Sequence, residues 1–313
     1  MPKRLIIFLF LSLSGCDQNQ SIEQVSGKTM GTTYLIKGQG VQANQQQVDV
    51  RLNQINKIFS SWDKSSEISQ LNRKPINHPI AISAELSQVL NAAIQVHQQT
   101  DGYFDPGLGQ LIDVWGFGAI SVLTKPDRKA IATALNNSSI VQTTLEGQKF
   151  SKKSDVYLNL SAIAKGYAVD EVYQLLDQQG IERFMVEIGG EIKVKGSWTI
   201  GIETPAGQSP IEIKLINKSI ATSGNYRQYF VWEGKNYAHI LDPHTGLPVN
   251  SDLFSASVIH SNNLLADAYA TAMMSMGSQK AIQLAQRLKL ETVLILEKCD
   301  NSCLSTNVVK IGL

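Results

Sequence analysis

The sequence lacks the signatures by which the common nucleotide-binding and nucleic-acid-binding proteins are recognised. It holds no Walker pattern and no Gly-x-Gly-x-x-Gly after a strand, so neither a P-loop nor a Rossmann dinucleotide site is supported. No basic run is interleaved with aromatic residues, and 28 basic residues nearly balance 27 acidic ones, which argues against nucleic-acid binding. These absences exclude the usual frameworks for both kinds of ligand.

Cysteine is also scarce, with three in 313 residues. Cys299 and Cys303 stand four apart and, outside the cytoplasm, could form a small disulfide loop. They could instead bind a metal, but two thiols without further Cys or His nearby make a poor zinc site. The sequence favours the disulfide loop and leaves open whether the two cysteines are bonded.

The apolar run at the N-terminus is too short to cross a membrane. Two basic residues precede Leu5–Leu11, whereas a transmembrane helix needs about 20 apolar residues, so the run is typical of a signal peptide. Leu13–Cys16 resembles the bacterial lipobox, in which Cys16 would be lipidated and become the mature N-terminus. The alternative is an ordinary signal peptide cut nearby. We predict a signal peptide over residues 1–15 and a polar tether over residues 16–26.

Residues 27–313 have the character of one globular domain, since the chain is 43% hydrophobic and 18% charged and shows no internal repeat or clear linker. Short β segments joined by tight turns are mixed with a few long helices, without the regular alternation of a doubly wound sheet. We therefore predict an α+β fold: a single domain with a mixed or mainly antiparallel sheet and helices packed around it.

Apolar residues recur at helical spacing in several stretches. This spacing predicts amphipathic helices over residues 46–60 and 84–100, the second with Ser83 as its N-cap. It also predicts a helix over residues 263–276 and another that ends at Leu290.

The stretch His239–Gly246 places two imidazoles and a carboxylate in a tight turn after a predicted strand, Asn236–Leu241. Pro243 fixes its own φ, and Gly246 can adopt a positive φ. A strand that ends in a rigid polar turn is a common way to hold catalytic groups still. The alternative is a plain hairpin turn with two surface histidines.

Asp267 and Thr271 are four residues apart in a predicted helix and therefore share a face. A carboxylate and a hydroxyl offer hard oxygen ligands, which suit Mg²⁺ better than zinc or copper. The neighbouring alanines at 266, 268, 270 and 272 indicate a buried helix, and a buried carboxylate needs a partner or a cation. The alternative is a capping or solvent-facing pair.

Two further segments have the composition of a ligand site. Asp101–Gly107 and Trp115–Gly118 combine glycine with aromatic residues, so backbone can approach a flat ligand on which rings stack. The alternative is a plain loop pinned by buried aromatic side chains. Asn159–Asp170 is predicted to turn a strand into a helix, whose first N–H groups favour anions such as phosphate.

A set of short motifs covers nearly all of residues 27–313. They are Met30-Gly31-Thr32, Ser61-Trp62 with Ser66-Glu67-Ile68, Gly102–Pro106, Trp115–Gly118, Leu158–Asp170, Gly189-Gly190, Thr222–Tyr226, His239–Gly246 and Ala266–Thr271. Together they resemble the ApbE family, the FAD:protein FMN transferases. The resemblance implies a periplasmic lipoprotein, anchored to the inner membrane, that splits FAD with Mg²⁺. FMN would be joined through a phosphoester to a Thr or Ser of an acceptor protein, such as a membrane redox-complex subunit, and AMP would be released.

The same resemblance assigns roles to individual residues. The metal ligands would be the side chains of Asp267 and Thr271 and the backbone carbonyl of Ala162. FAD contacts carry over to Met30, Trp62, Tyr103, Phe104, Asp105, Asn159, Lys165 and Leu241.

The acceptor hydroxyl must lose a proton, and an unperturbed imidazole titrates at about 6.5, so His239 is the predicted base. Asp242 is predicted to orient His239 or to bind the substrate, and His244 to be structural or solvent-facing.

Three residues depart from the family pattern. Asn159 stands where many members have Asp, Lys165 where some have Glu, and Ala270 where some have a second carboxylate near the metal. Two other functions remain open at this point. One is a Mg²⁺-dependent FAD pyrophosphatase that yields FMN and AMP, and the other is a non-catalytic periplasmic flavin-binding lipoprotein.

Overall fold

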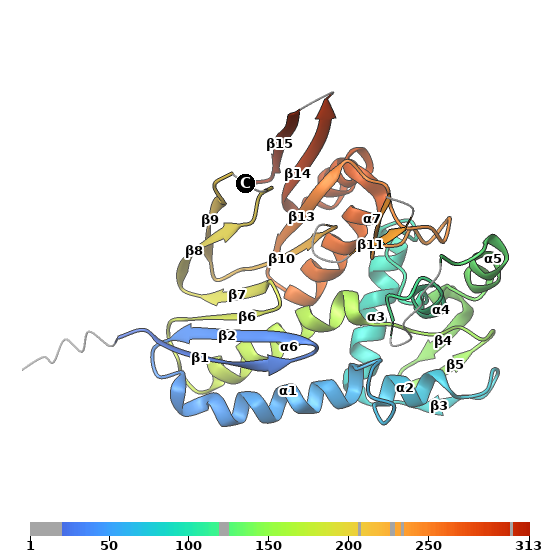
Figure 1. Ribbon diagram of the computed structural model, residues 1–313. Helices are drawn as coiled ribbons and strands as arrows, with labels where there is room; N and C mark the ends of the chain where they lie inside the picture. The colour runs from blue at the N-terminus through green and yellow to red at the C-terminus, as the bar shows by residue number, and fades with distance from the viewer. Residues whose placement is uncertain (1–20, 119–124, 206–207, 226–228, 233–234, 301–302) are drawn as a thin grey trace, which may run out of the picture.

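The computed structural model describes residues 21–313 apart from 119–124, 206–207, 226–228, 233–234 and 301–302. It confirms the predicted α+β architecture, in which an antiparallel sheet stands beside a layer of helices (Figure 1). In the described ranges, no helix is both long enough and apolar enough to span a membrane. The predicted signal peptide and Cys16 lie outside the described residues and stay predictions.

The main sheet has eight strands, all paired antiparallel. Across the sheet they are β1 (Glu23–Thr29), β2 (Thr32–Gly38), β6 (Phe184–Ile188), β7 (Glu191–Lys195), β10 (Ser219–Gly224), β13 (Leu253–His260), β14 (Glu291–Asp300) and β15 (Cys303–Ile311). Cys299 and Cys303 lie on the last two strands, where the side chains are outside the description, so the predicted disulfide is not tested.

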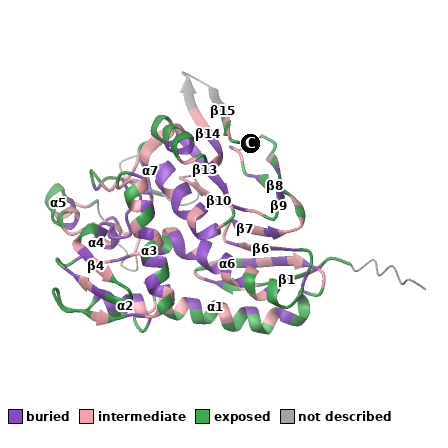
Figure 2. Ribbon diagram, turned by 180° about the vertical axis from the view of Figure 1, so that it is seen from behind, coloured by how far each residue is buried: buried purple, intermediate pink, exposed green. Residues whose placement is uncertain are grey.

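Helices cover one face of this sheet, and apolar side chains between the two layers form the main core (Figure 2). The predicted amphipathic helices are present as α1 (Gln45–Phe59) and α3 (Ala84–Gln99). The Ser83 hydroxyl caps α3 by accepting from the Leu86 N–H at 3.1 Å. The other helices are α2 (Glu67–Asn72), α4 (Gly109–Val114), α5 (Arg128–Asn136), α6 (Ser161–Gln178) and α7 (Asn263–Leu288), with 3₁₀ turns at Gln42–Asn44 and Ile140–Gln142.

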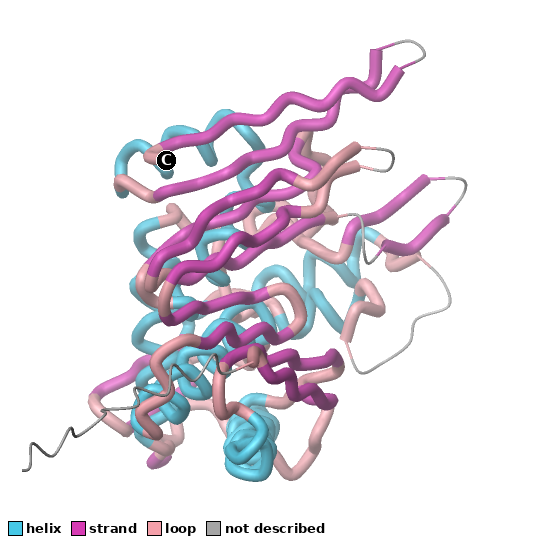
Figure 3. The backbone as a smooth tube through the Cα atoms, turned by 90° about the vertical axis from the view of Figure 1, so that its left-hand side faces the viewer, coloured by secondary structure: helices cyan, strands magenta, loops and turns pink. Residues whose placement is uncertain are grey.

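A second, smaller apolar cluster lies on the other face of the sheet, where the hairpin of β8 (Ser197–Ile202) and β9 (Ile211–Ile216) packs. Figure 3 shows the strands with the helices packed beside them. With both faces covered, β13 is buried along nearly its whole length. The remaining strands form two small sheets: β3 (Ile80–Ala81), β5 (Lys149–Lys152) and β4 (Thr143–Glu146), and the pair β11 (Tyr229–Trp232) and β12 (Lys235–Ala238).

The structure corrects three predicted boundaries. β1 begins at Glu23, so the fold starts inside the segment that we expected to be a tether. No strand leads into α6, because the chain before it makes only an isolated bridge between Leu108 and Tyr157. The strand before the turn of His239–Gly246, which we call the central turn, ends at Ala238, three residues earlier than predicted. The two helices expected near the C-terminus are present within α7, which is interrupted at Gly277 (φ 77°).

Candidate active site

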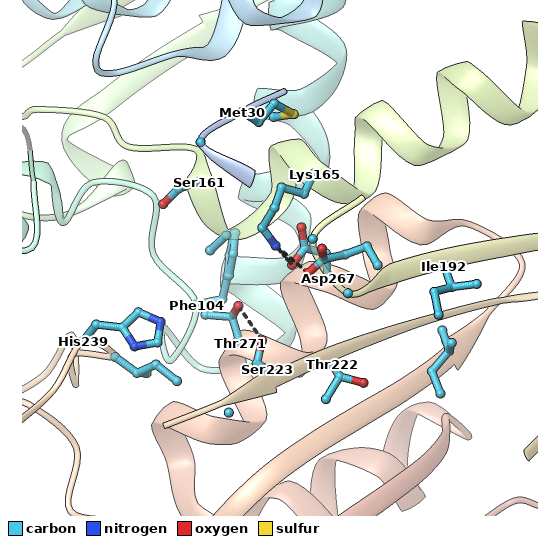
Figure 4. A pocket seen from close by; sticks show the side chains of 18 of the residues that line it. Met30, Phe104, Ser161, Lys165, Ile192, Thr222, Ser223, His239, Asp267 and Thr271 are labelled. Carbon is cyan, nitrogen blue, oxygen red and sulfur yellow. Dashed lines mark hydrogen bonds and ion pairs between the residues drawn. The ribbon is translucent and has the colours of Figure 1, made fainter. Parts of the chain in front are cut away.

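A cavity of about 890 Å³ opens where α6, α7 and the loops around them meet (Figure 4). Its size is near the upper end of the range of about 300–1,000 Å³ for small-molecule pockets. It is lined by Met30, Trp62, Tyr103, Phe104, Asp105, Asn159, Ala162, Lys165, His239, Leu241, Asp267 and Thr271. Every predicted metal, FAD and catalytic residue except Asp242 is in this set, although the set spans more than 240 positions of the chain.

One side of the cavity rim is formed by the turn between β1 and β2. Its two residues, Met30 (φ 49°) and Gly31 (φ 72°), both have left-handed backbone conformations, as a two-residue hairpin turn requires. Glycine adopts this conformation without strain, whereas methionine does so at a cost of about 1–2 kcal/mol. Nearby on the lining, Trp62 keeps 67% of its surface exposed. A large aromatic ring left in solvent at the rim is available to stack on a flat ligand.

The loop after α3 is held by the carboxylate of Asp105. Its oxygens have four partners: the N–H groups of Gly107 (2.7 Å) and Ile140 (2.8 Å), the hydroxyl of Ser139 (2.7 Å) and the imidazole of His97 (3.3 Å). Burial raises the pKa of this carboxyl, and these partners oppose the rise. Because its oxygens are already engaged, Asp105 shapes the loop, in which the half-buried Tyr103 and the buried Phe104 both line the cavity.

The first turn of α6 borders the cavity. Asn159 accepts the Ser161 N–H at 2.9 Å and donates its own N–H to the Pro106 carbonyl at 2.7 Å, which ties the helix start to the loop after α3. Ser161 and Ala162 follow on the lining. A helix N-terminus attracts anions through its free N–H groups and its dipole, so this wall suits phosphate.

Asp267 and Thr271 lie one turn apart on the face of α7 that borders the cavity (Figure 4). Asp267 is 2% exposed and accepts the Gly166 N–H at 3.0 Å, while the Thr271 hydroxyl lies 3.2 Å from that of Ser223 on β10. The hydrogen bond from Gly166 to Asp267 joins α6 to α7. These helices can pack closely because position 166 is glycine: a Cβ there would lie 2.4 Å from the Asn263 carbonyl oxygen.

A lysine and a second carboxylate stand beside Asp267. The Lys165 ammonium group donates to Glu191, the first residue of β7, and lies 3.9 Å from an Asp267 oxygen. Burial raises the pKa of both carboxyls, while Lys165 lowers both. Sequence reasoning missed Glu191. Its only signal in the sequence is a charged residue directly after Gly189-Gly190, at a position whose burial only the fold reveals.

The residues present fit a divalent cation. Asp267 and Thr271 supply hard oxygens of the kind that Mg²⁺ prefers, and Ala162 lines the same cavity. Among the described residues, no three or more His, Cys, Asp and Glu side chains gather as a metal site. A cation here would therefore take the rest of its coordination from backbone, water or substrate, which is typical of Mg²⁺ with phosphates.

His239 lies just after β12 and lines the cavity, with its ring centroid 6.3 Å from that of Phe117. Asp242, which we expected to orient His239 or bind the substrate, does not line the cavity. Its carboxylate accepts the N–H of His244 at 2.9 Å and the hydroxyl of Thr245 at 3.1 Å. It therefore stabilises its own turn, as an Asp before proline commonly does.

His244 is exposed and packs its ring against Tyr103, with centroids 4.4 Å apart. Its Nε2 lies 3.1 Å from the Asp101 carbonyl oxygen. The central turn is thus joined to the loop after α3, and both segments contribute to the same cavity.

Comparison with known proteins agrees with the resemblance in the sequence. The model of the ApbE family matches residues 30–294. The FAD:protein FMN transferase of Vibrio cholerae is 36% identical over 93% of this chain and 92% of its own length. The protein of the same name from Haemophilus influenzae is 35% identical over 95% and 92%.

Solved structures agree with the fold. The flavin transferase ApbE from Vibrio cholerae superposes with a TM-score of 0.85 at 34% identity, covering 93% of this chain and 98% of that one. The apo form of the flavinyl transferase ApbE from Pseudomonas stutzeri gives 0.84 at 28% identity, covering 94% and 98%. The family model, these relatives and these structures each match nearly the whole chain. The chain therefore belongs to the ApbE family.

Proposed function

We propose that this protein is an FAD:protein FMN transferase, which moves FMN from FAD to a Thr or Ser hydroxyl of an acceptor protein and releases AMP. One observation carries the proposal: Asp267, Thr271 and His239, drawn from distant parts of the chain, line a single cavity with room for a dinucleotide. The name shared by the relatives supports the same reaction class.

In the proposed reaction the acceptor hydroxyl oxygen attacks the phosphorus on the FMN side of the pyrophosphate. The bond from that phosphorus to the bridging oxygen breaks, and AMP leaves with this oxygen. His239 takes the proton of the attacking hydroxyl, which is the role expected of an imidazole at the edge of such a cavity. The start of α6 and Lys165 line the same cavity, where their positive charge would stabilise the negative phosphates.

The proposed metal is Mg²⁺, held by the side chains of Asp267 and Thr271 with the Ala162 carbonyl. When bound, the ion would neutralise charge on the pyrophosphate and so favour departure of AMP. Ala270, fully buried, supplies no second carboxylate, so the site depends on Asp267 more heavily than one with two acidic ligands.

Two other functions use the same cavity. A pyrophosphatase would pass FMN to water, and a flavin-binding protein would not cut FAD at all. Incubation with FAD, Mg²⁺ and a periplasmic extract, followed by in-gel flavin fluorescence and mass spectrometry, separates the three. Covalent FMN on a Thr or Ser supports transfer, free FMN with AMP supports hydrolysis, and intact FAD supports binding alone.

We also propose that the mature protein is a periplasmic lipoprotein of the inner membrane, anchored through Cys16. The lipobox-like Leu13–Cys16 supports this location. Fractionation of cells that express Cys16→Ser tests it: the variant is expected in the soluble periplasmic fraction, and continued membrane association would count against the anchor.

A further inference from the structure

The Lys165 ammonium group faces two buried carboxylates that come from different parts of the fold (Figure 4). It extends from α6, Glu191 begins β7, and Asp267 lies on α7. The ammonium group is hydrogen-bonded to Glu191, whereas the Asp267 oxygen is 3.9 Å away, at the limit of an ion pair. Lys165 is therefore bound by Glu191 and only adjacent to Asp267.

The burial of Glu191 costs stability that its contacts repay only in part. The residue is 2% exposed, and its Oε2 has no hydrogen-bond partner among the residues that the structure describes. A buried carboxylate carries a desolvation cost of several kcal/mol, and apolar residues of similar size usually fit such positions as well or better. A charge at this position therefore points to a function at the cavity that Glu191 lines.

The turn before Glu191 packs against both the start of β2 and the Lys165 side chain. Gly189 has a φ of 60°, and a Cβ at this position would lie 2.9 Å from Thr32 and 3.4 Å from the Cδ of Lys165. The Gly190 N–H donates to Glu187 at 2.8 Å, which holds the turn. Glycine at position 189 thus lets the turn pack against Thr32 at the start of β2, with the Lys165 stem in contact on the other side.

We propose that Glu191 is a positioning residue: it holds the Lys165 ammonium group on the cavity wall, away from Asp267, so that Asp267 stays free for a divalent cation. The inference rests on the proposed function, since it assumes that Asp267 is a cation ligand. The site then presents two positive charges to the pyrophosphate. One is the fixed ammonium group of Lys165, and the other is an exchangeable ion.

The charges explain why the lysine needs an anchor. Without Glu191, the ammonium group still lies 3.9 Å from an Asp267 oxygen, and two opposite charges in a buried site attract strongly. Lys165 would close the 3.9 Å gap and compete with the divalent ion for the same oxygen. Removing Glu191 is therefore expected to weaken cation binding, and removing Lys165 as well is expected to restore it.

The test is titration of Mn²⁺ into the purified protein without FAD, followed by electron paramagnetic resonance of the free ion. We expect Glu191→Gln to raise the dissociation constant for Mn²⁺ about tenfold, a typical size for coupling between neighbouring sites. The double variant Glu191→Gln with Lys165→Met is expected to bind Mn²⁺ as the wild type does, within about twofold. Circular dichroism checks that each variant is folded.

A matched control removes an ion pair outside the cavity. Lys218 and Glu291 pair at 2.5 and 2.7 Å, and neither lines the cavity, so Glu291→Gln should leave Mn²⁺ binding unchanged. Unchanged affinity in Glu191→Gln, or the same loss with and without Lys165, would overturn the inference. These outcomes differ from failure of the proposed function, in which the wild type binds Mn²⁺ but transfers no FMN.

Discussion

Two charged clusters each include residues of α6, and they differ in how many hydrogen bonds their carboxylate oxygens accept. In the first, which we call the framework cluster, Arg51 donates to Glu85 at 2.6 Å and to Glu171 at 2.7 Å, and Tyr167 donates to Glu85 at 2.7 Å. In the second, the cavity cluster of Lys165, Glu191 and Asp267, one oxygen of Glu191 has no partner among the described residues.

The pKa shifts follow the same division. Burial raises the pKa of Glu85, but the hydrogen bonds from Arg51 and Tyr167 outweigh it, so the pKa is lowered overall. In the cavity cluster the effect of burial exceeds that of Lys165, so the pKa values of Glu191 and Asp267 are raised. The framework cluster, whose charges pair with one another, joins α1, α3 and α6. The cavity cluster, whose carboxylates are not fully paired, is suited to bind an additional positive charge.

The largest expected effect is on catalysis, from the cavity cluster. Asp267→Asn keeps the shape of the side chain but removes the charge that the proposed cation needs. We expect the rate of AMP release from FAD to fall by a factor of about 100 or more. The melting temperature should hold or rise, because a buried carboxylate has been neutralised. If AMP release is unchanged, Asp267 has no part in the reaction.

The framework cluster should show the opposite behaviour. Arg51→Met leaves two carboxylates without their cation and is expected to cost about 1–3 kcal/mol of unfolding free energy, less than for a fully buried pair. Denaturant unfolding measures this loss. The KM for FAD should stay within about twofold of the wild type, because Arg51 does not line the cavity. A large change in KM with full stability would mean that the division between the clusters is wrong.

A third prediction concerns the rim of the cavity, where a substitution is expected to change the affinity for FAD and leave the stability of the fold unchanged. Trp62→Ala removes an exposed ring and is expected to cost about 1–3 kcal/mol of FAD affinity, the usual value for stacking on an aromatic side chain. Titration of FAD followed by fluorescence gives the dissociation constant. Unchanged affinity would remove Trp62 from the site.

The smallest expected effect is the pH dependence of stability. Because the folded-state pKa of Glu85 lies below its ordinary value of 4.5, Glu85 stabilises the fold fully above about pH 4.5. This contribution is lost as the pH falls through the lowered pKa. Glu85→Gln should therefore be less stable than the wild type at pH 7, with the difference shrinking in acid. Melting temperatures measured between pH 3 and pH 7 check this, and a constant difference would contradict it.

Local patterns predicted the parts of this protein that depend on local spacing. The recurrence of apolar residues located α1 and α3, and the four-residue separation of Asp267 and Thr271 placed both on one face of α7. Short β segments with tight turns indicated the antiparallel sheet. In each of these cases a few neighbouring residues carry the whole signal.

The sequence does not reveal contacts between side chains that are distant along the chain. Nothing near Glu191 shows that it meets a lysine 26 positions away, and nothing near Asp105 shows that Ile140 and His97 occupy its oxygens. Asp242 was predicted to orient His239 or to bind the substrate. In the structure its carboxylate bonds to His244 and Thr245 of its own turn instead. Proximity along the chain was a poor guide to the direction of a side chain.

The central claim is that a divalent cation sits between Asp267 and Thr271 where the pyrophosphate of FAD is cut. Anomalous scattering from crystals of the protein soaked with Mn²⁺ and FAD tests it most directly. We predict a peak within about 2.5 Å of both an Asp267 oxygen and the Thr271 hydroxyl, in contact with a phosphate oxygen. A fully occupied peak elsewhere, with these two side chains left unliganded, would contradict the account.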